Sequence, residues 1–213
     1  MSIKYALLSL LSGRDSTGYE VSRHFGKSVG HVWEAPESQI YPELNRLAQQ
    51  GLLEVDELPD GARGTKKRYR VTAAGLDELQ DWIESPTARR RQRDPIYLKA
   101  AYLEWADPAQ VRTIMQDHLD HNAERLDVLR RTREMLLEGT HPTLAQRMER
   151  YPADQHEKIL AWKVFAYDRL IEQASEEIAW AKRGMELADR FEGTAPLRDR
   201  PASGDRDERP PST

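Results

Sequence analysis

The chain has 213 residues, of which 32% are charged and 38% hydrophobic, and it contains no cysteine. This composition disfavours one wide hydrophobic core and favours long helices with polar outer faces. The lack of cysteine excludes disulfides and thiolate metal sites. No apolar run reaches the ~18 residues that a membrane-spanning helix needs, so we expect no membrane span and a cytoplasmic location.

The formal net charge of −4 argues, as a sum, against nucleic acid, but the charge is unevenly distributed. Residues 1–75 hold 10 basic and 9 acidic residues, which gives +1, whereas residues 76–194 hold 18 and 23, which gives −5. Residues 63–70 (RGTKKRYR) contain five basic residues and no acid. Positive charge is therefore focused on one short segment, as in proteins that bind nucleic acid locally.

The N-terminal region predicts two short helices. The apolar run from Ile3 to Leu11 predicts the first, and residues 12–16 read as a loop. The sequence Thr17-Gly-Tyr-Glu20 has the spacing of a capping box, so a second helix is expected from Gly18 to about Phe25. Residues 26–30 are turn-like, and a short extended piece is expected at residues 32–33.

The segment over residues 37–53 (ESQIYPELNRLAQQGLL) predicts a third helix with one apolar face. Pro42 has no N–H, which is harmless only near a helix start, so the helix is expected to begin at Ser38 or Gln39 with Ser38 as N-cap. Gly51 suits the left-handed position after the helix. With the preceding helix, this predicts a helix-turn-helix whose first turn is suited to a DNA groove.

A basic hairpin follows this helix. Residues 52–57 read as a strand, residues 59–61 (PDG) as a turn signal and residues 65–71 as the returning strand. Thr72 is expected to cap a helix that runs through Ile83. Residues 86–94 then form a basic linker and a domain boundary.

Long helices dominate the rest of the chain. A short helix is expected at residues 95–104, a long one from Pro108 to Leu137, a short piece at 142–150 and a final helix over 153–191. The final helix would span roughly 58 Å and therefore needs partners. We expect one side to meet its own chain and the other a second copy, through a heptad seam of Leu160, Val164, Tyr167, Ile171, Ala174, Ile178, Ala181 and Met185.

The stretches SQIYPELNRLAQQGLL and GTKKRYRVTAAG resemble the recognition helix and the wing of the PadR family of bacterial transcriptional regulators. The long helices resemble the larger C-terminal domain of part of that family. The resemblance implies a mainly α protein with a winged helix-turn-helix at residues 1–85 and a helical dimerisation domain at 95–192. The basic linker at 86–94 lies between them, and the composition of residues 193–213, rich in Pro, Gly, Ser, Asp and Arg, predicts a disordered tail. The resemblance also implies a homodimeric repressor that binds a palindromic operator and is released from it by a small (aromatic) effector. No cofactor is expected.

Ten residues are candidates for contact with double-stranded DNA. The recognition helix would contact base edges or phosphates, and the wing would contact phosphates or the minor groove. The alternatives are an ordinary surface helix and an edge strand protected by charge. Tyr19 could equally be buried. The candidates are Tyr19, Ser38, Gln39, Tyr41, Asn45, Arg46, Arg63, Lys66, Lys67 and Arg68.

Other features have simpler interpretations. Trp162 and Trp180 are candidate residues for an effector pocket, although packing between helices is the favoured interpretation. The Asp117-His118-Leu-Asp120-His121 cluster is read as a solvated or interfacial face rather than a metal site. No catalytic motif is present, so no enzyme is expected. A winged helix used only for protein assembly and a helical-bundle enzyme with an appended winged helix stay open as alternatives.

Overall fold

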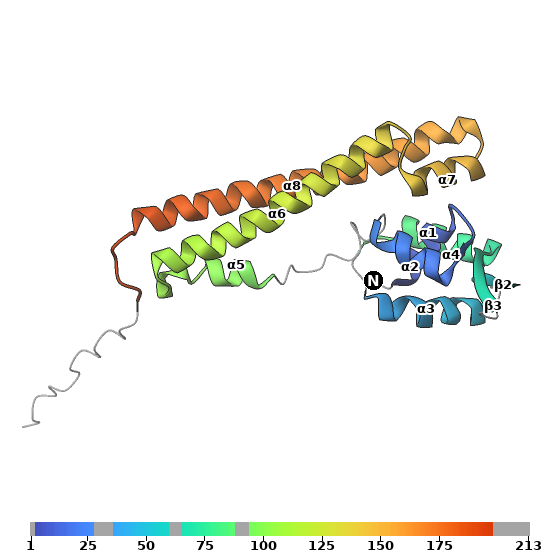
Figure 1. The fold of residues 1–213 in the computed structure, drawn as a ribbon, viewed down its shortest axis with the longest axis horizontal. Coiled ribbons are helices and arrows are strands. Elements are labelled where there is room, and N and C mark those ends of the chain that lie inside the picture. Colours follow the sequence, from blue (N-terminus) through green and yellow to red (C-terminus); the bar gives the residue numbers. More distant parts are fainter. Residues whose placement is uncertain (1–2, 28–35, 60–64, 88–93, 198–213) are drawn as a thin grey trace, which may run out of the picture. The chain divides into compact units, whose positions relative to one another are not determined.

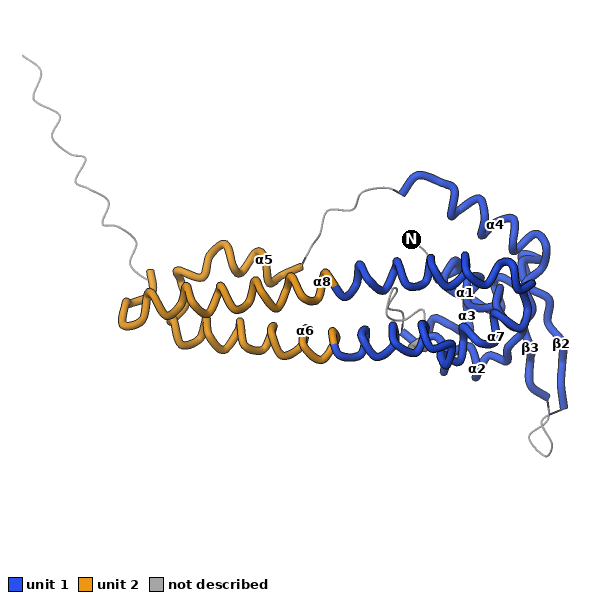
Figure 2. The backbone as a smooth tube through the Cα atoms, turned by 90° about the horizontal axis from the view of Figure 1, so that it is seen from above, with its two compact units in different colours: residues 1–88, 127–171 blue, residues 89–126, 172–213 orange. Residues whose placement is uncertain are grey.

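The computed structural model describes residues 3–27, 36–59, 65–87 and 94–197. The chain divides into two compact units, shown in Figure 2. The first unit comprises residues 1–88 and 127–171, and the second comprises residues 89–126 and 172–213. The expected domain division at residues 86–94 stays a prediction, and residues 88–93 lie outside the described part.

The first unit contains a winged helix-turn-helix (Figure 1). A three-stranded antiparallel sheet in the order β1-β3-β2 accompanies its helices, which confirms the mainly α fold with a wing. In chain order the elements are α1 (Ile3–Leu11), β1 (Ser16–Thr17), α2 (Gly18–Lys27), α3 (Glu37–Gln49), β2 (Leu53–Pro59), β3 (Thr65–Val71) and α4 (Ala73–Glu84).

One hydrophobic core holds these elements together. The apolar faces of α1, α2 and α3 meet there, and the inward residues of β2, β3 and α4 close it. Leu44 and Leu47 of α3 are completely buried, as are Leu7 and Leu8 of α1. Because the apolar face of α3 is fixed in this way, its polar face is directed to solvent.

The start of α3 differs from the expectation. The helix begins at Glu37, and its N-cap is Pro36 without a side-chain cap bond, so Ser38 lies inside the first turn and is not the cap. Pro42 consequently lies in the second turn and offers no N–H to the carbonyl of Ser38. The helix tolerates this loss because Leu44 and Leu47 bury its opposite face.

The end of α3 agrees with the expectation. Gly51 has a φ of +73°, a left-handed conformation that glycine adopts at low cost. The Leu52 N–H donates to the Leu47 carbonyl and the Gly51 N–H donates to the Ala48 carbonyl, both at 3.0 Å. These two bonds make a Schellman motif, which satisfies carbonyls at the helix end.

The sequence reading missed β1. It treated residues 12–16 as a loop, yet Ser16 pairs with Tyr69 and Thr17 with Arg68 of β3. Two residues are too few to show the alternation by which a strand is recognised. The capping box that follows is confirmed, since the Thr17 N–H donates to Glu20 at 2.8 Å and the Glu20 N–H donates to Thr17 at 3.3 Å.

Six further elements follow in the described residues from 94 to 197. The helix expected at 95–104 is divided in two, and the final helix begins three residues later than expected. In Figures 1 and 2 the two long helices run side by side in opposite directions. The elements are α5 (Pro95–Ala100), η3 (Leu103–Trp105), α6 (Pro108–Leu137), α7 (Pro142–Arg150), η4 (Ala153–Gln155) and α8 (His156–Arg190).

The seam of α8 is partly covered by its own chain. Tyr167, Ala174 and Ala181 have at most 2% of their surface exposed. The packing of α6 on α8 is close, because a Cβ built on Gly184 would lie 2.7 Å from the sulfur of Met115. These three seam residues therefore belong to an interface within the chain, whereas Leu160, Val164, Ile171, Ile178 and Met185 are only half-buried.

The segments after α8 and between α2 and α3 are described in part. The Leu197 N–H donates to the Glu104 carbonyl at 2.9 Å. The disordered tail expected at 193–213 stays a prediction, and most of it lies outside the described part. Residues 198–213 and 28–35, with the expected extended piece at 32–33, lie outside the described part. None of the described helices combines the length and the apolar character that crossing a membrane requires.

The contact of α4 with the end of α3 gives a stability test. A Cβ on Gly75 would lie 2.3 Å from the Leu52 carbonyl oxygen and 2.8 Å from Val71. We expect Gly75→Ala to lower the free energy of unfolding by about 2 kcal/mol, because backbone must move to make room.

Gly139→Ala is the matched control. Unlike Gly75, Gly139 has a positive φ, and no atom lies within 4 Å of a built Cβ, so only the left-handed strain of about 1 kcal/mol is expected there. Urea unfolding followed by circular dichroism measures both. Equal losses at the two positions would contradict the close approach at Gly75.

Candidate nucleic-acid interface

The exposed face of α3 carries the predicted reading residues. Ser38, Gln39, Tyr41, Asn45 and Arg46 are all exposed, while Ile40 between them is 2% exposed and faces the core. This division follows from the helical period, which places the polar positions on one side. The structure thus presents all five predicted residues of this helix to solvent.

Tyr41 leans over the start of α2. A Cβ built on Gly18 would lie 2.6 Å from Cε1 of the Tyr41 ring, so the ring can occupy this place only because residue 18 is glycine. Tyr19, the next residue, is 68% exposed, and the Arg23 guanidinium lies 6.0 Å from the centre of its ring. The alternative of a buried Tyr19 is therefore wrong in this structure.

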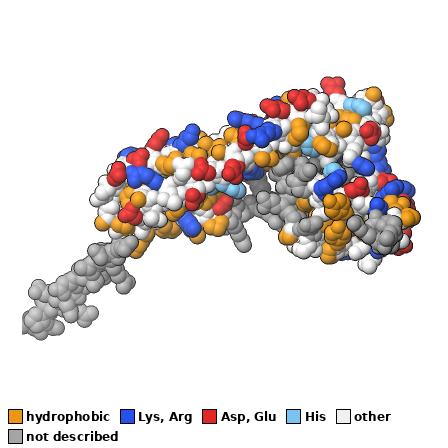
Figure 3. All heavy atoms as spheres, viewed as in Figure 1, with side chains coloured by type: hydrophobic (Ala, Val, Ile, Leu, Met, Phe, Trp, Pro, Cys, Tyr) orange, Lys and Arg blue, Asp and Glu red, His pale blue; other side chains and the backbone are white. Residues whose placement is uncertain are grey.

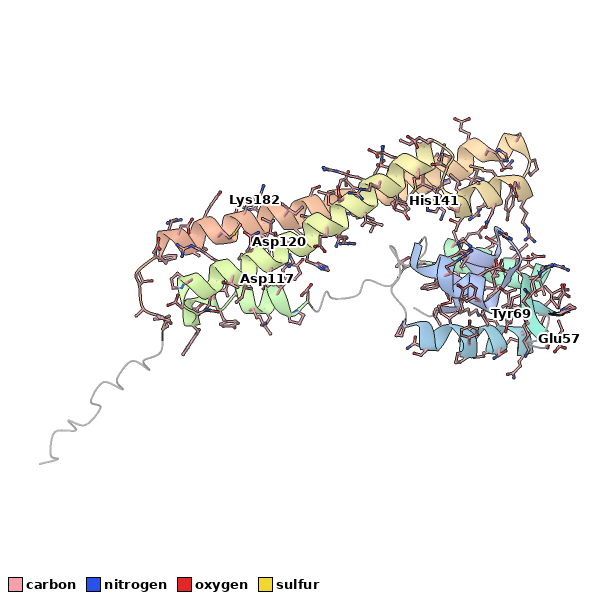
Figure 4. The ribbon with its side chains drawn as sticks, in the orientation of Figure 1. Glu57, Tyr69, Asp117, Asp120, His141 and Lys182 are labelled. Carbon is pink, nitrogen blue, oxygen red and sulfur yellow. The ribbon has the colours of Figure 1, made fainter. Side chains whose placement is uncertain are left out.

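Asn45 is oriented by the wing strand. The Tyr69 hydroxyl of β3 donates to Oδ1 of Asn45 at 3.3 Å, and Figure 4 shows Tyr69 beside α3. Burial and the nearby Tyr41 raise the pKa of Tyr69, so its hydroxyl stays protonated and able to donate. With Oδ1 engaged in this way, the two N–H donors of the Asn45 amide are directed away from Tyr69.

Arg46 is engaged within its own helix. Its Nε and one terminal nitrogen donate to Glu43 at 2.8 and 2.6 Å. This pairing raises the pKa of Arg46 and offsets its charge. Arg46 therefore contributes less positive potential than the sequence suggests, and a phosphate would compete with Glu43 for it.

The basic residues of the wing strand β3 fall into two groups, one exposed and one paired with carboxylates. Lys66, Lys67 and Arg68 are exposed. Arg70 instead lies within 2.8 Å of Asp15, 3.5 Å of Glu54 and 3.3 Å of Asp56. Arg70 thus joins the wing to the loop after α1, and only its neighbours remain directed outward. Arg63 lies outside the described residues.

The carboxylate of Asp15 joins two distant elements. It accepts from Nε of Arg70 at 2.8 Å and from a terminal nitrogen of Arg150 at 3.0 Å. Burial alone would raise the pKa of this carboxyl, but the two guanidinium groups outweigh burial and hold the pKa below its usual value. Asp15 is therefore ionised at neutral pH and ties α7 to the wing.

A groove of about 1270 Å³ brings many of these residues together. Six of the ten predicted residues line it, namely Tyr19, Tyr41, Asn45, Lys66, Lys67 and Arg68. Ser38, Gln39 and Arg46 lie on α3 outside its lining. The sequence analysis missed the groove's other basic residues, Arg14, Arg23 and Arg150, because they are single residues on a loop and two different helices with no local pattern.

The comparisons with known proteins agree with this geometry. A winged helix-turn-helix with an exposed polar helix and a basic wing defines a class of DNA-binding protein. Residues 7–81 match the model of the transcriptional regulator PadR-like family. The chain is also 30% identical over 141 residues to the negative transcriptional regulator PadR of Bacillus subtilis, across 66% of this chain and 78% of that protein. The chain belongs to the PadR-like family of transcriptional regulators.

Solved structures share the fold. The crystal structure of Bacillus subtilis PadR in complex with operator DNA superposes with a TM-score of 0.68 at 24% identity, covering 88% of this chain and 99% of that one. The same protein in complex with p-coumaric acid gives 0.63 at 24%, covering 88% and 95%. The Vibrio cholerae virulence activator AphA gives 0.62 at 22%, covering 89% and 99%.

In the histidine–aspartate cluster on α6, His118 is hydrogen-bonded within the chain. His118 lies 3.0 Å from Glu177 of α8 and 3.2 Å from Asn122. Asp117, Asp120 and His121 are exposed on α6, where Figure 4 labels the two aspartates. No group of three or more potential metal ligands occurs among the described residues.

The two candidate effector tryptophans have different surroundings. Trp180 makes edge contacts with Tyr97 at 5.6 Å and with His118 at 5.4 Å, so it packs between helices of the second unit. Trp162 is 65% exposed in the first unit and contacts Phe165 edge-on. The packing interpretation therefore describes Trp180, whereas Trp162 is open to solvent.

The double pairing of Asp15 predicts a pH dependence. Because its pKa is depressed in the folded state, ionised Asp15 stabilises the fold above the unfolded value of about 3.9, and this contribution is lost as pH falls through the folded pKa. We expect Asp15→Asn to cost about 1 kcal/mol at neutral pH and progressively less below about pH 4.

Urea unfolding at a series of pH values measures this. Asp127→Asn is the control, because Asp127 pairs with Arg131 on the exposed face of α6 and little change is expected there. A loss for Asp15→Asn that stayed constant from neutral pH to pH values below the folded pKa would show that the ion pairs contribute nothing.

Proposed function

We propose that this PadR-like regulator acts in the cytoplasm as a repressor that binds a palindromic operator as a homodimer. The observation that carries the proposal is the convergence of the exposed polar face of α3 and the outward cations of β3 on one face of the first unit. The name of the Bacillus subtilis relative, a negative regulator, supports repression.

In the proposed complex α3 enters the major groove. Ser38, Gln39 and Tyr41 in its first two turns reach base edges or phosphates, since short and planar polar groups fit the donor–acceptor pattern there. Asn45 presents its amide donors in the orientation that Tyr69 sets. Lys66, Lys67 and Arg68 bind phosphates, which position the protein without reading sequence.

The proposed homodimer forms through the helical hairpin. An apolar groove of about 390 Å³ is lined by Leu137 of α6 and by Leu160, Val164 and Phe165 of α8. Leu137 and Phe165 are 52% and 65% exposed, and Figure 3 shows hydrophobic side chains at the surface between charged ones along these helices. A second copy would cover this surface. Two-fold symmetry would then place two α3 helices about 34–36 Å apart, in successive major grooves.

The proposed effector is a small aromatic molecule. The complex of Bacillus subtilis PadR with p-coumaric acid supports this class of ligand. An effector that binds one arrangement of the dimer better than the other would shift the spacing of the two α3 helices and release the operator. Trp162 remains a candidate residue for such a pocket because it is exposed, whereas Trp180 is engaged by Tyr97 and His118.

The DNA surface is tested with two substitutions. We expect Arg68→Ala to weaken binding about three- to tenfold, with a salt slope smaller by about one, because one phosphate contact is lost. Tyr41→Ala removes an α3 side chain and is expected to weaken binding about tenfold. A mobility shift with the DNA upstream of the protein's own gene measures both, and p-coumaric acid is added to the wild-type complex to test release.

Lys182→Ala is the control, because Lys182 is an exposed cation on α8 of the second unit (Figure 4). If Arg68→Ala and Tyr41→Ala both bind like this control with unchanged salt slopes, the surface is not a DNA surface. A winged helix used only for protein assembly would give that result.

The dimer is tested by mass. Twice the chain mass of 24.6 kDa is 49.2 kDa, which light scattering should report for the wild type in dilute buffer. Val164→Asp places a carboxylate in the apolar groove and is expected to give the monomer mass. Lys182→Asp, with the same carboxylate on an exposed position of α8, should stay dimeric. A wild type that runs at monomer mass would end the proposal.

A further inference from the structure

The groove beside the wing has a wall that does not belong to the winged helix. Gln146, Glu149 and Arg150 of α7 line it opposite the residues of α2 and β3. α7 follows the turn after α6 and is separated in sequence from the wing by more than 70 residues. A segment from the helical part of the chain therefore borders the proposed DNA surface.

The charge of this groove is positive even when its internal pairs are counted. Its basic lining residues are Arg14, Arg23, Lys66, Lys67, Arg68 and Arg150, and its acidic ones are Asp15, Glu20 and Glu149. Six positive and three negative groups leave a sum of +3. Such a surface favours an extended polyanion over a neutral or cationic partner.

The two arginines of α7 have different positions. Arg147 packs against the loop after α1, where its Cβ lies 3.3 Å from a Cβ built on Gly13, and its guanidinium lies 5.5 Å from the centre of the Tyr151 ring. Arg150 is instead 36% exposed at its side chain and uses one terminal nitrogen for Asp15 at 3.0 Å. A guanidinium has five N–H donors, so four remain for another acceptor.

Asp15 positions Arg150. The same carboxylate also accepts from Arg70, which in turn faces Glu54 and Asp56, so this cluster as a whole has no excess of positive charge. Arg150 therefore contributes a guanidinium that is held in place and retains donors, on a groove whose lining residues sum to a positive charge. A positioned guanidinium that retains donors is well suited to a phosphate, whose oxygens match its planar geometry.

We infer that α7 is a third DNA-contacting element, in which Arg150 and Gln146 bind a backbone phosphate of the duplex that α3 and the wing engage. The inference rests on the proposed function and extends it to a helix outside the winged helix. Glu149, on the same helix and exposed, repels that phosphate and weakens binding. Arg150 therefore strengthens DNA binding, whereas the neighbouring Glu149 weakens it.

The test uses the full chain and a fluorescent duplex of about 30 base pairs with random sequence, because phosphate contacts do not depend on sequence. Arg150→Gln is expected to weaken binding and to make the salt slope smaller by about one, so its deficit shrinks about three- to fourfold between about 50 and 200 mM salt. Arg150→Lys keeps the charge and should retain the wild-type slope. Glu149→Gln should bind more tightly than the wild type.

Arg131→Ala is the matched control, since Arg131 is an exposed arginine on α6 of the same unit, paired with Asp127, and does not line the groove. If Arg150→Gln and Glu149→Gln both follow this control while Arg68→Ala weakens binding, α7 does not touch DNA and only this inference fails. If Arg68→Ala is also silent, the proposed function fails as well. Should Arg150→Gln unfold, Glu149→Gln decides the outcome, because it leaves the bond between Arg150 and Asp15 in place.

Discussion

The arrangement of the proposed DNA-binding surface depends on one carboxylate. Asp15 accepts hydrogen bonds from Arg70, 55 residues later, and from Arg150, 135 residues later. It directly precedes β1, which pairs with β3 and leads into the capping box of α2. Asp15 therefore connects the wing with α7, beside the start of α2.

The sequence predicted several helix caps and helix ends, which depend on residues close together in the chain. The capping box at Thr17 and Glu20, the left-handed Gly51 and the Thr72 cap each lie within a few residues of the group they satisfy, and each is confirmed. Contacts between distant residues were missed. β1 is too short to show a period, and Arg14, Arg23 and Arg150 become neighbours only after folding, so no spacing in the chain reveals their groove.

The heptad seam of α8 is a second example of a contact that the sequence alone did not identify. Periodicity identifies a face that must be covered but does not say by what. Ala174 and Ala181 are covered by α6 of the same chain, whose Asn122 bonds to His118 and thereby connects to Glu177. A polar group inside an apolar seam fixes the register of two helices at some cost in stability. The alanines thus report close packing within the hairpin, and their half-buried neighbours are the part of the seam that the proposed homodimer would cover.

Pro42 changes the backbone hydrogen bonding of the first turn of α3. In an α-helix the carbonyl of Ser38 would normally accept a hydrogen bond from the N–H four residues later, but Pro42 has no N–H. The Ser38 carbonyl points along the helix toward Pro42 and therefore lacks its usual partner. No substitution of Ser38 restores that hydrogen bond, because the missing donor belongs to residue 42, so replacing the proline rather than the serine is the change that would complete the helical hydrogen bonding there.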